Sequence, residues 1–249
     1  MQIYQADQSA LCRNVGQYIW NGLRRGDGVL IVASAEHRKL FTEHLVSRGT
    51  DIKAFVETNR LVMLDASQTL SRFMIGAQPD WHRFEAVIRE AIHRVHPAAG
   101  SEGLRAYGEM VGILWKRRQF AAAIRLEQLW NKVMEQSVFS LYCAYAIDLF
   151  GNDFEMSQLE SVLCTHTHLL PSDPDGSLEA ALNRSLDDIL GPEADNLRLR
   201  IKAHHRSSWA VMASVESAVL WLRRYLPEKA EEIVSRARNY QALQHESVS

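Results

Sequence analysis

The chain of 249 residues lacks several features that mark specialised classes of protein. It has three cysteines, a small and odd number that argues against a disulfide framework. We expect no membrane span, because no run of 18 or more apolar residues occurs, and its opening residues do not resemble a secretory signal. Lys and Arg number 28 against 30 Asp and Glu, without the basic excess of a nucleic-acid-binding protein. We therefore expect a soluble, cytoplasmic protein that binds neither nucleic acid nor membranes directly.

Sequence signatures of catalysis are also missing. The segment 33–39, which follows the first expected strand, has none of the glycines that let a phosphate loop surround an anion, and Glu36 would repel phosphate. The chain contains no Gly-x-Ser-x-Gly motif, and no complete set of metal ligands is recognisable. We therefore expect a binding protein that is not an enzyme and needs no cofactor.

What the sequence does contain is an alternation of short apolar runs with helical patterns. The runs predict buried strands at 29–33, 61–64, 104–107 and 140–145, and the segments between them predict helices. Nearly continuous apolar strands separated by helices are typical of a parallel sheet that is covered on both faces. The fold class we expect is α/β, with a mostly parallel sheet and helices on both faces.

The C-terminal part has a different pattern. Its composition predicts a domain over 1–171, a linker over 172–191 and a helical hairpin over 192–249. The hairpin has a narrow apolar stripe that ends before Pro227 and consists of Met212, Val215, Val219, Leu222 and Leu226. The stripe could pack on its own chain or on a second copy, and we favour dimerisation.

Polar and aromatic residues follow the expected strands, where parallel α/β sheets bind ligands. They are Ser34, His37, Asp65, Tyr107, Glu109 and Tyr145. One interpretation is a small pocket with a carboxylate, an imidazole and aromatic walls. The alternative assigns Ser34 and Asp65 to helix caps, and the two tyrosines to the core. For Glu109 both interpretations stay open: it could line the pocket, or its charge could simply be stabilised by the N-terminus of the helix that follows it.

The segment Cys164-Thr165-His166-Thr167-His168 is the part of the chain richest in soft metal ligands. With Cys143 it could form a zinc site, but its spacing matches no standard zinc pattern. We therefore expect a packed cysteine and partly exposed histidines, and no metal.

Several short motifs occur together in an order that resembles one known family. They are Tyr107-Gly108-Glu109-Met110, Leu114-Trp115, the run 126–131, the run 139–145 and Cys164-Thr165-His166, preceded by Tyr4, the segment 35–38 and Asp65. Over about residues 2–171 the chain resembles the MEDS domain, a sensory domain named from methanogens, methylotrophs and a dichloromethane-responsive regulator.

The resemblance implies a RecA/KaiC-like fold that has lost its phosphate loop. It also implies a cytoplasmic signal-input protein that recognises a small, hydrocarbon-like molecule. By matching position, the family's recurrent residues here are Glu109, Glu127, Trp130, Asn131, Cys143, Tyr145 and His166. With Tyr4, His37, Asp65 and Tyr107 they form the candidate ligand-binding set.

The chain departs from the family pattern in two respects. Arg118 stands where the turn between two helices usually has a glycine, so we expect a different local turn. The 192–249 hairpin stands where a kinase or DNA-binding region is often joined, so either a separate protein, such as a histidine kinase or a transcriptional regulator, completes the signalling path, or the hairpin itself is the output. We also expect a homodimer. The alternative is a non-catalytic scaffold for protein contacts, derived from a RecA-like NTPase fold, with its pocket filled by side chains.

Overall fold

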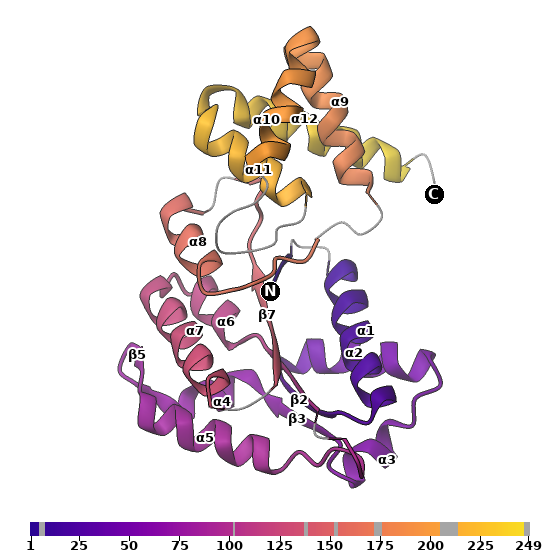
Figure 1. Ribbon diagram of the computed structural model, residues 1–249, viewed down its shortest axis with the longest axis vertical. Coiled ribbons are helices and arrows are strands. Elements are labelled where there is room, and N and C mark those ends of the chain that lie inside the picture. The colour runs from indigo at the N-terminus through magenta and orange to yellow at the C-terminus, as the bar shows by residue number, and fades with distance from the viewer. Residues whose placement is uncertain are drawn as a thin grey trace. The chain divides into compact units, whose positions relative to one another are not determined.

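The computed structural model describes residues 1–4, 8–101, 103–136, 139–151, 154–171, 176–204 and 214–246 (Figure 1). The chain divides into two compact units, Met1–Ala146 and Ile147–Ser249. Across the described ranges, no helix is both long enough and apolar enough to cross a bilayer.

The first unit is built on a five-stranded parallel sheet. In chain order the strands are β1 (Gln2–Tyr4), β2 (Gly28–Ala33), β3 (Leu61–Asp65), β6 (Leu104–Gly108) and β7 (Ser140–Ala146). Their order across the sheet is β1-β7-β6-β2-β3, and every neighbouring pair is parallel. All residues of β2 are buried, as its continuous apolar run predicts. Two short strands, β4 (Met74–Ile75) and β5 (Gln78–Pro79), form a separate antiparallel pair.

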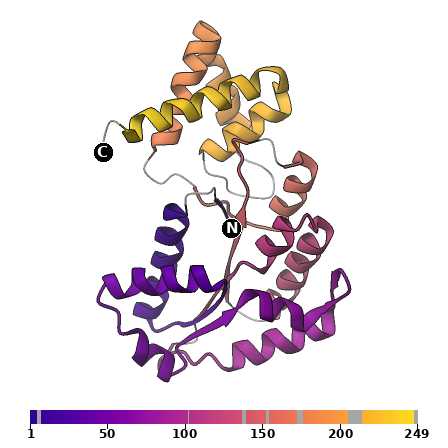
Figure 2. The same ribbon diagram turned by 180° about the vertical axis from the view of Figure 1, so that it is seen from behind.

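Helices cover both faces of this sheet. They are α1 (Ser9–Arg25), α2 (Ala35–Ser47), α3 (Ile52–Glu57), α4 (Ala66–Phe73), α5 (Trp81–His93), α6 (Met110–Lys116) and α7 (Phe120–Met134). Seen from the front and from behind, α1 and α2 lie on one side of the sheet and α4 to α7 on the other (Figures 1 and 2). The expected fold class is therefore confirmed.

The turn between α6 and α7 keeps the conformation that a glycine favours. Arg118 has a φ of 57°, in the left-handed region, and its N–H donates to the carbonyl of Trp115 at 2.8 Å. Arg118 therefore holds a left-handed backbone conformation that a glycine adopts at lower cost. Within α6, a Cβ on Gly112 would lie 2.8 Å from the carbonyl oxygen of Ala144, so the absence of a side chain permits a close approach of α6 to β7.

The second unit is helical and larger than the expected hairpin. It contains α8 (Met156–Leu163), α9 (Ser177–Leu190), a 3₁₀ turn (Gly191–Glu193), α10 (Ala194–His204), α11 (Ser214–Tyr225) and α12 (Pro227–Glu246). Helix α9 falls within the range expected to be a linker, of which 172–175 lie outside the described residues. It is helical because Leu178, Leu182 and Leu186 form a buried face. Its Ser185 hydroxyl also donates to the carbonyl of Ile233 in α12 at 2.7 Å.

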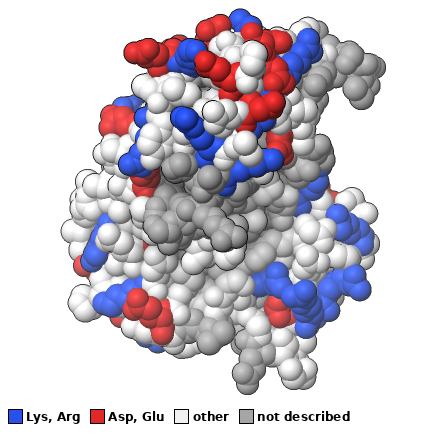
Figure 3. All heavy atoms as spheres, turned by 45° about the horizontal axis from the view of Figure 1, so that its top comes forward, with Lys and Arg blue, Asp and Glu red and all other residues white. Residues whose placement is uncertain are grey.

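The apolar stripe of α11 is used inside the second unit. Val215, Val219 and Leu222 are buried, and α11 packs against α9 and α12. Met212 lies outside the described residues. Pro227 opens α12, as its position at a helix start allows. On the face of the second unit in view, Lys and Arg are interspersed with Asp and Glu (Figure 3).

Candidate functional site

The site begins at the carboxyl ends of β2 and β6, which are neighbours in the sheet. Glu109 follows the last residue of β6, and its N–H donates to the carbonyl of Val32 in β2 at 3.2 Å. Ser34 follows β2 and caps α2, where its side-chain oxygen accepts the N–H of His37 at 3.2 Å. Two adjacent parallel strands therefore deliver a carboxylate and a helix N-terminus to the same edge of the sheet.

The Glu109 carboxylate is surrounded by three hydrogen-bond donors. Its Oε1 accepts the backbone N–H of Ser34, and its Oε2 is bonded to His37 Nδ1 and accepts the Tyr107 hydroxyl at 3.2 Å. Glu109 and His37 are each 5% exposed, and Tyr107 is 1% exposed. Burial by itself raises the pKa of Glu109, but the bonds from His37 and Ser34 outweigh it and hold the pKa below its ordinary value. The group is therefore a buried anion at neutral pH.

The other side of the His37 ring contacts a partner that sequence reasoning missed. His37 Nε2 lies 2.8 Å from Oε1 of Gln8, which directly precedes α1. A rotated Gln8 amide would present an NH₂ group in place of the oxygen, so the same pair suits a charged or a neutral imidazole. Nothing in the local sequence marks Gln8, because its role depends on the tertiary approach of α1 and α2.

Aromatic rings enclose the imidazole. The ring of Tyr4 lies 5.9 Å from the His37 ring edge-on, and Phe41 stacks on His37 at 5.7 Å. Phe41 in turn meets Tyr107 edge-on at 5.1 Å. Burial, and then the nearby Glu109, raises the pKa of both Tyr4 and Tyr107, so both remain phenols. We call the side chains of Tyr4, His37, Phe41, Tyr107 and Glu109, together with Gln8, the strand-end cluster.

Asp65 is a helix cap, as the alternative interpretation predicts. Its carboxylate accepts the N–H of Gln68 at 2.9 Å and the guanidinium of Arg38 at 3.1 Å. The Gln68 N–H has the largest effect and lowers the pKa of Asp65; burial opposes it, and Arg38 lowers the pKa further, so the pKa lies below its ordinary value. The same guanidinium donates to the carbonyl of Ala33 at 2.7 Å. None of these bonds joins Asp65 to the strand-end cluster.

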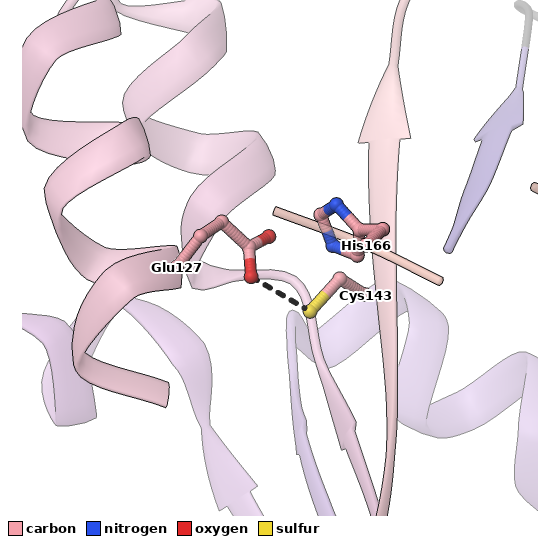
Figure 4. Close-up of side chains that lie close together, drawn as sticks. All are labelled: Glu127, Cys143 and His166. Atoms are coloured by element: carbon pink, nitrogen blue, oxygen red, sulfur yellow. Dashed lines mark hydrogen bonds between the residues drawn. The ribbon is translucent and has the colours of Figure 1, made fainter. Parts of the chain in front are cut away.

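A second buried group lies between α7 and β7. Glu127 of α7 accepts the hydroxyl of Tyr145 at 2.7 Å and the thiol of Cys143 at 3.4 Å (Figure 4). All three residues are 1% exposed or less. Burial, and then the charge of Glu127, raises the pKa of the Cys143 thiol and of the Tyr145 hydroxyl. A carboxylate and a thiol are both possible metal ligands, and the thiol would bind as the thiolate.

The remaining candidate residues lie in three different surroundings. Trp130 is 1% exposed and packs edge-on against Phe84 at 5.2 Å, so it belongs to the core of the first unit. Asn131 is half-buried on the same helix. His166 belongs to the second unit, where its Nδ1 lies 2.9 Å from the carbonyl oxygen of Val162 and 3.0 Å from the hydroxyl of Thr165.

The second unit also contains a cavity that the sequence did not suggest. Its volume is about 330 Å³, and α9, α10 and α11 line it with apolar side chains such as Leu182, Leu186 and Ile201 and with polar ones such as Arg198. Arg198 is already bonded to Asp187. The cavity has the size of a small ligand site, but residues 205–213, next to its lining in the chain, lie outside the described ranges.

Comparisons with known proteins agree with this architecture. The family described as MEDS, "MEthanogen/methylotroph, DcmR Sensory domain", matches residues 1–167. The chain is similar to UPF0273 protein PH0284 of Pyrococcus horikoshii, with 28% identity over 87 residues, which make up 32% of this chain and 35% of the relative. It is also similar to UPF0273 protein PF1931 of Pyrococcus furiosus, with 26% identity over the same shares. The chain thus spans about a third of the length of these curated relatives.

Proposed function

Since this chain belongs to the MEDS family of sensory domains, we propose that it is a signal-input protein that binds a small molecule at its strand-end cluster. The observation that carries the proposal is the buried network of His37, Tyr107 and Glu109 at the carboxyl edge of a parallel sheet. Ligands of open α/β sheets bind at this edge. Buried titratable groups that contact one another there are typical of functional sites.

The chemistry of the cluster favours a small, largely apolar ligand with one polar group. The rings of Tyr4 and Phe41 contact the His37 imidazole and make the surroundings of its polar atoms apolar. The polar group of the ligand would replace the Gln8 amide at His37 Nε2, because Gln8 is half-buried and its Oε1 lies 2.8 Å from that nitrogen. Such a ligand agrees with the hydrocarbon-like compounds that the family resemblance implies.

We assign the other buried candidates a supporting role in the same unit. The bonds that Tyr145 and Cys143 give to Glu127 join α7 to β7, the neighbour of β6 in the sheet. Trp130 extends that contact into the core. Substitutions here are expected to act through stability, whereas substitutions at His37 are expected to act on ligand affinity.

Ligand binding can be tested by calorimetry and thermal shift with small apolar, halogenated and alcohol-bearing compounds. His37→Gln and Tyr107→Phe should abolish or weaken the response of the parent protein, because the first replaces the imidazole with an amide that cannot become charged and the second removes a hydroxyl while keeping the ring. His93→Gln is the matched control, since His93 is exposed on α5. A response that survives both substitutions would place the ligand elsewhere.

We also propose that the signal reaches a separate protein, a histidine kinase or a transcriptional regulator, and that the chain forms a homodimer. Leu199 and Leu243 of the second unit are 68% and 61% exposed, and they offer apolar contact surface. Light scattering coupled to size exclusion, with and without ligand, tests the dimer. Leu199→Ser and Leu243→Ser should shift it toward monomer if these side chains make the contact.

A second candidate function is a scaffold that binds proteins and no small molecule. It is favoured by the fact that both oxygens of Glu109 already accept bonds from the protein itself. In that case no compound would raise the melting temperature, while substitutions on α10 and α12 would still abolish binding of a partner protein. This combination of results separates the scaffold from the sensor.

A further inference from the structure

The junction between β2 and α2 is a place where anions bind in α/β proteins. A helix N-terminus carries partial positive charge and presents unpaired N–H groups, and α2 is 13 residues long. At this junction the N–H of Ser34 donates to the carboxylate of Glu109, which follows β6 and lies 75 residues later in the chain. The anion at this helix terminus is thus a side chain of the protein.

The position of Glu109 has the properties of a built anion site. One carboxylate oxygen accepts the Ser34 N–H. The other is bonded to His37 Nδ1 and accepts the Tyr107 hydroxyl, which lies 3.2 Å away. The carboxylate is 5% exposed, so the protein itself provides what a hydration shell would provide in water. A bound formate or phosphate oxygen would use the same donors.

We infer that Glu109 is a built-in anion that fills the anion site at the N-terminus of α2, and that it restricts the ligands of the strand-end cluster to neutral or cationic molecules. A nucleotide or another anion would have to displace the carboxylate, or lie beside it where little water screens the repulsion. The restriction on ligands rests on the proposed function, whereas the occupancy of the anion site by Glu109 is independent of whether the protein binds a ligand.

The test is to remove the carboxylate and supply an anion from solution. Glu109→Ala should gain affinity for formate or inorganic phosphate by about tenfold or more over the parent, measured as a saturable rise in melting temperature at constant ionic strength. Glu36→Ala is the matched control: Glu36 lies exposed in the first turn of α2, so its removal changes the same charge near the same terminus without emptying the site. Equal responses of the two variants and the parent would overturn the inference.

A second variant covers the case in which Glu109→Ala does not fold. Glu109→Gln keeps the shape but replaces a charged acceptor of the Ser34 N–H with a neutral one. In NMR spectra the Ser34 amide proton should move upfield, because the neutral oxygen is the weaker acceptor. An unchanged Ser34 resonance would show that the carboxylate does not occupy the site.

A separate binding experiment tests the restriction on ligands, with benzylamine, benzyl alcohol and benzoate as probes of similar shape. The parent should bind the amine or the alcohol at least about tenfold more tightly than benzoate, and Glu109→Gln should reduce this preference. Benzoate binding to the parent as tightly as benzylamine would overturn the restriction. Failure of all three probes would count against the proposed function, while the formate titration alone decides whether Glu109 fills the anion site.

Discussion

Replacing Glu109 by Gln should change the stability of the first unit in a manner that depends on pH. The substitution keeps the side-chain shape, and the amide oxygen can still accept the N–H of Ser34. The amide NH₂ group, however, would face His37 Nδ1 and the Tyr107 hydroxyl, which now donate to a carboxylate. Losing two bonds to a charged, buried acceptor costs about 2–4 kcal/mol of unfolding free energy at neutral pH.

The sign of the pH dependence follows from the direction of the Glu109 pKa. Because the folded protein holds this pKa below the ordinary value of 4.5, the carboxylate stabilises the fold fully above about that pH. The contribution is lost as the pH falls through the folded pKa. The parent and Glu109→Gln should therefore differ most at neutral pH and converge in acid.

Hydrogen exchange in urea can measure this effect for the first unit by itself. Peptides from β2 and β6 report unfolding of the sheet that carries Glu109, without interference from the helical second unit. Glu36→Gln serves as the control, because this exposed residue of α2 makes no part of the network. A difference between the parent and Glu109→Gln that stays constant from neutral pH to pH 3 would refute the assignment of an ionised, hydrogen-bonded carboxylate.

Three further predictions concern other parts of the chain. In the native protein iodoacetamide should modify Cys164 at least about a hundredfold faster than Cys143, because Cys164 is exposed whereas Cys143 is buried and the pKa of its thiol is raised. Mass spectrometry of the two peptides measures the two rates. Gly112→Ala should destabilise the first unit by about 1–3 kcal/mol in urea, despite the better helix propensity of Ala, because its Cβ would contact the carbonyl of Ala144. Arg118→Gly should stabilise the same unit by up to about 1 kcal/mol by relieving its left-handed backbone, and a loss of stability would contradict that reasoning.

Much of the sheet was predictable because its central strands carry continuous apolar runs. The run 29–33 became the fully buried β2, and the predicted caps Ser34 and Asp65 both bond to N–H groups of the helices they begin. Strand β1 was not identified as a strand, since three residues give no periodicity and only pairing with β7 defines it. Helix α9 was missed because the Pro, Gly and Ser residues before it dominate the composition of that segment.

The candidate site could be predicted from the sequence in part. Residues at the carboxyl ends of neighbouring parallel strands must lie close together, and His37, Tyr107 and Glu109 do. The contribution of Gln8 and of the backbone N–H of Ser34 could not be read from the sequence. Both depend on how helices α1 and α2 approach the ends of strands that are far away in the chain.

The pairing of β1 with β7 bears on the order in which the chain acquires its structure. Gln2 lies beside Ala144 in this pairing, so β1, which precedes the other four strands of this sheet in the chain, cannot pair until β7 has been synthesised. Tyr4, one wall of the strand-end cluster, lies on β1. During synthesis the cluster can therefore be completed only after residue 146 has emerged, and a truncated chain ending before β7 would contain His37 and Glu109 without a closed site around them.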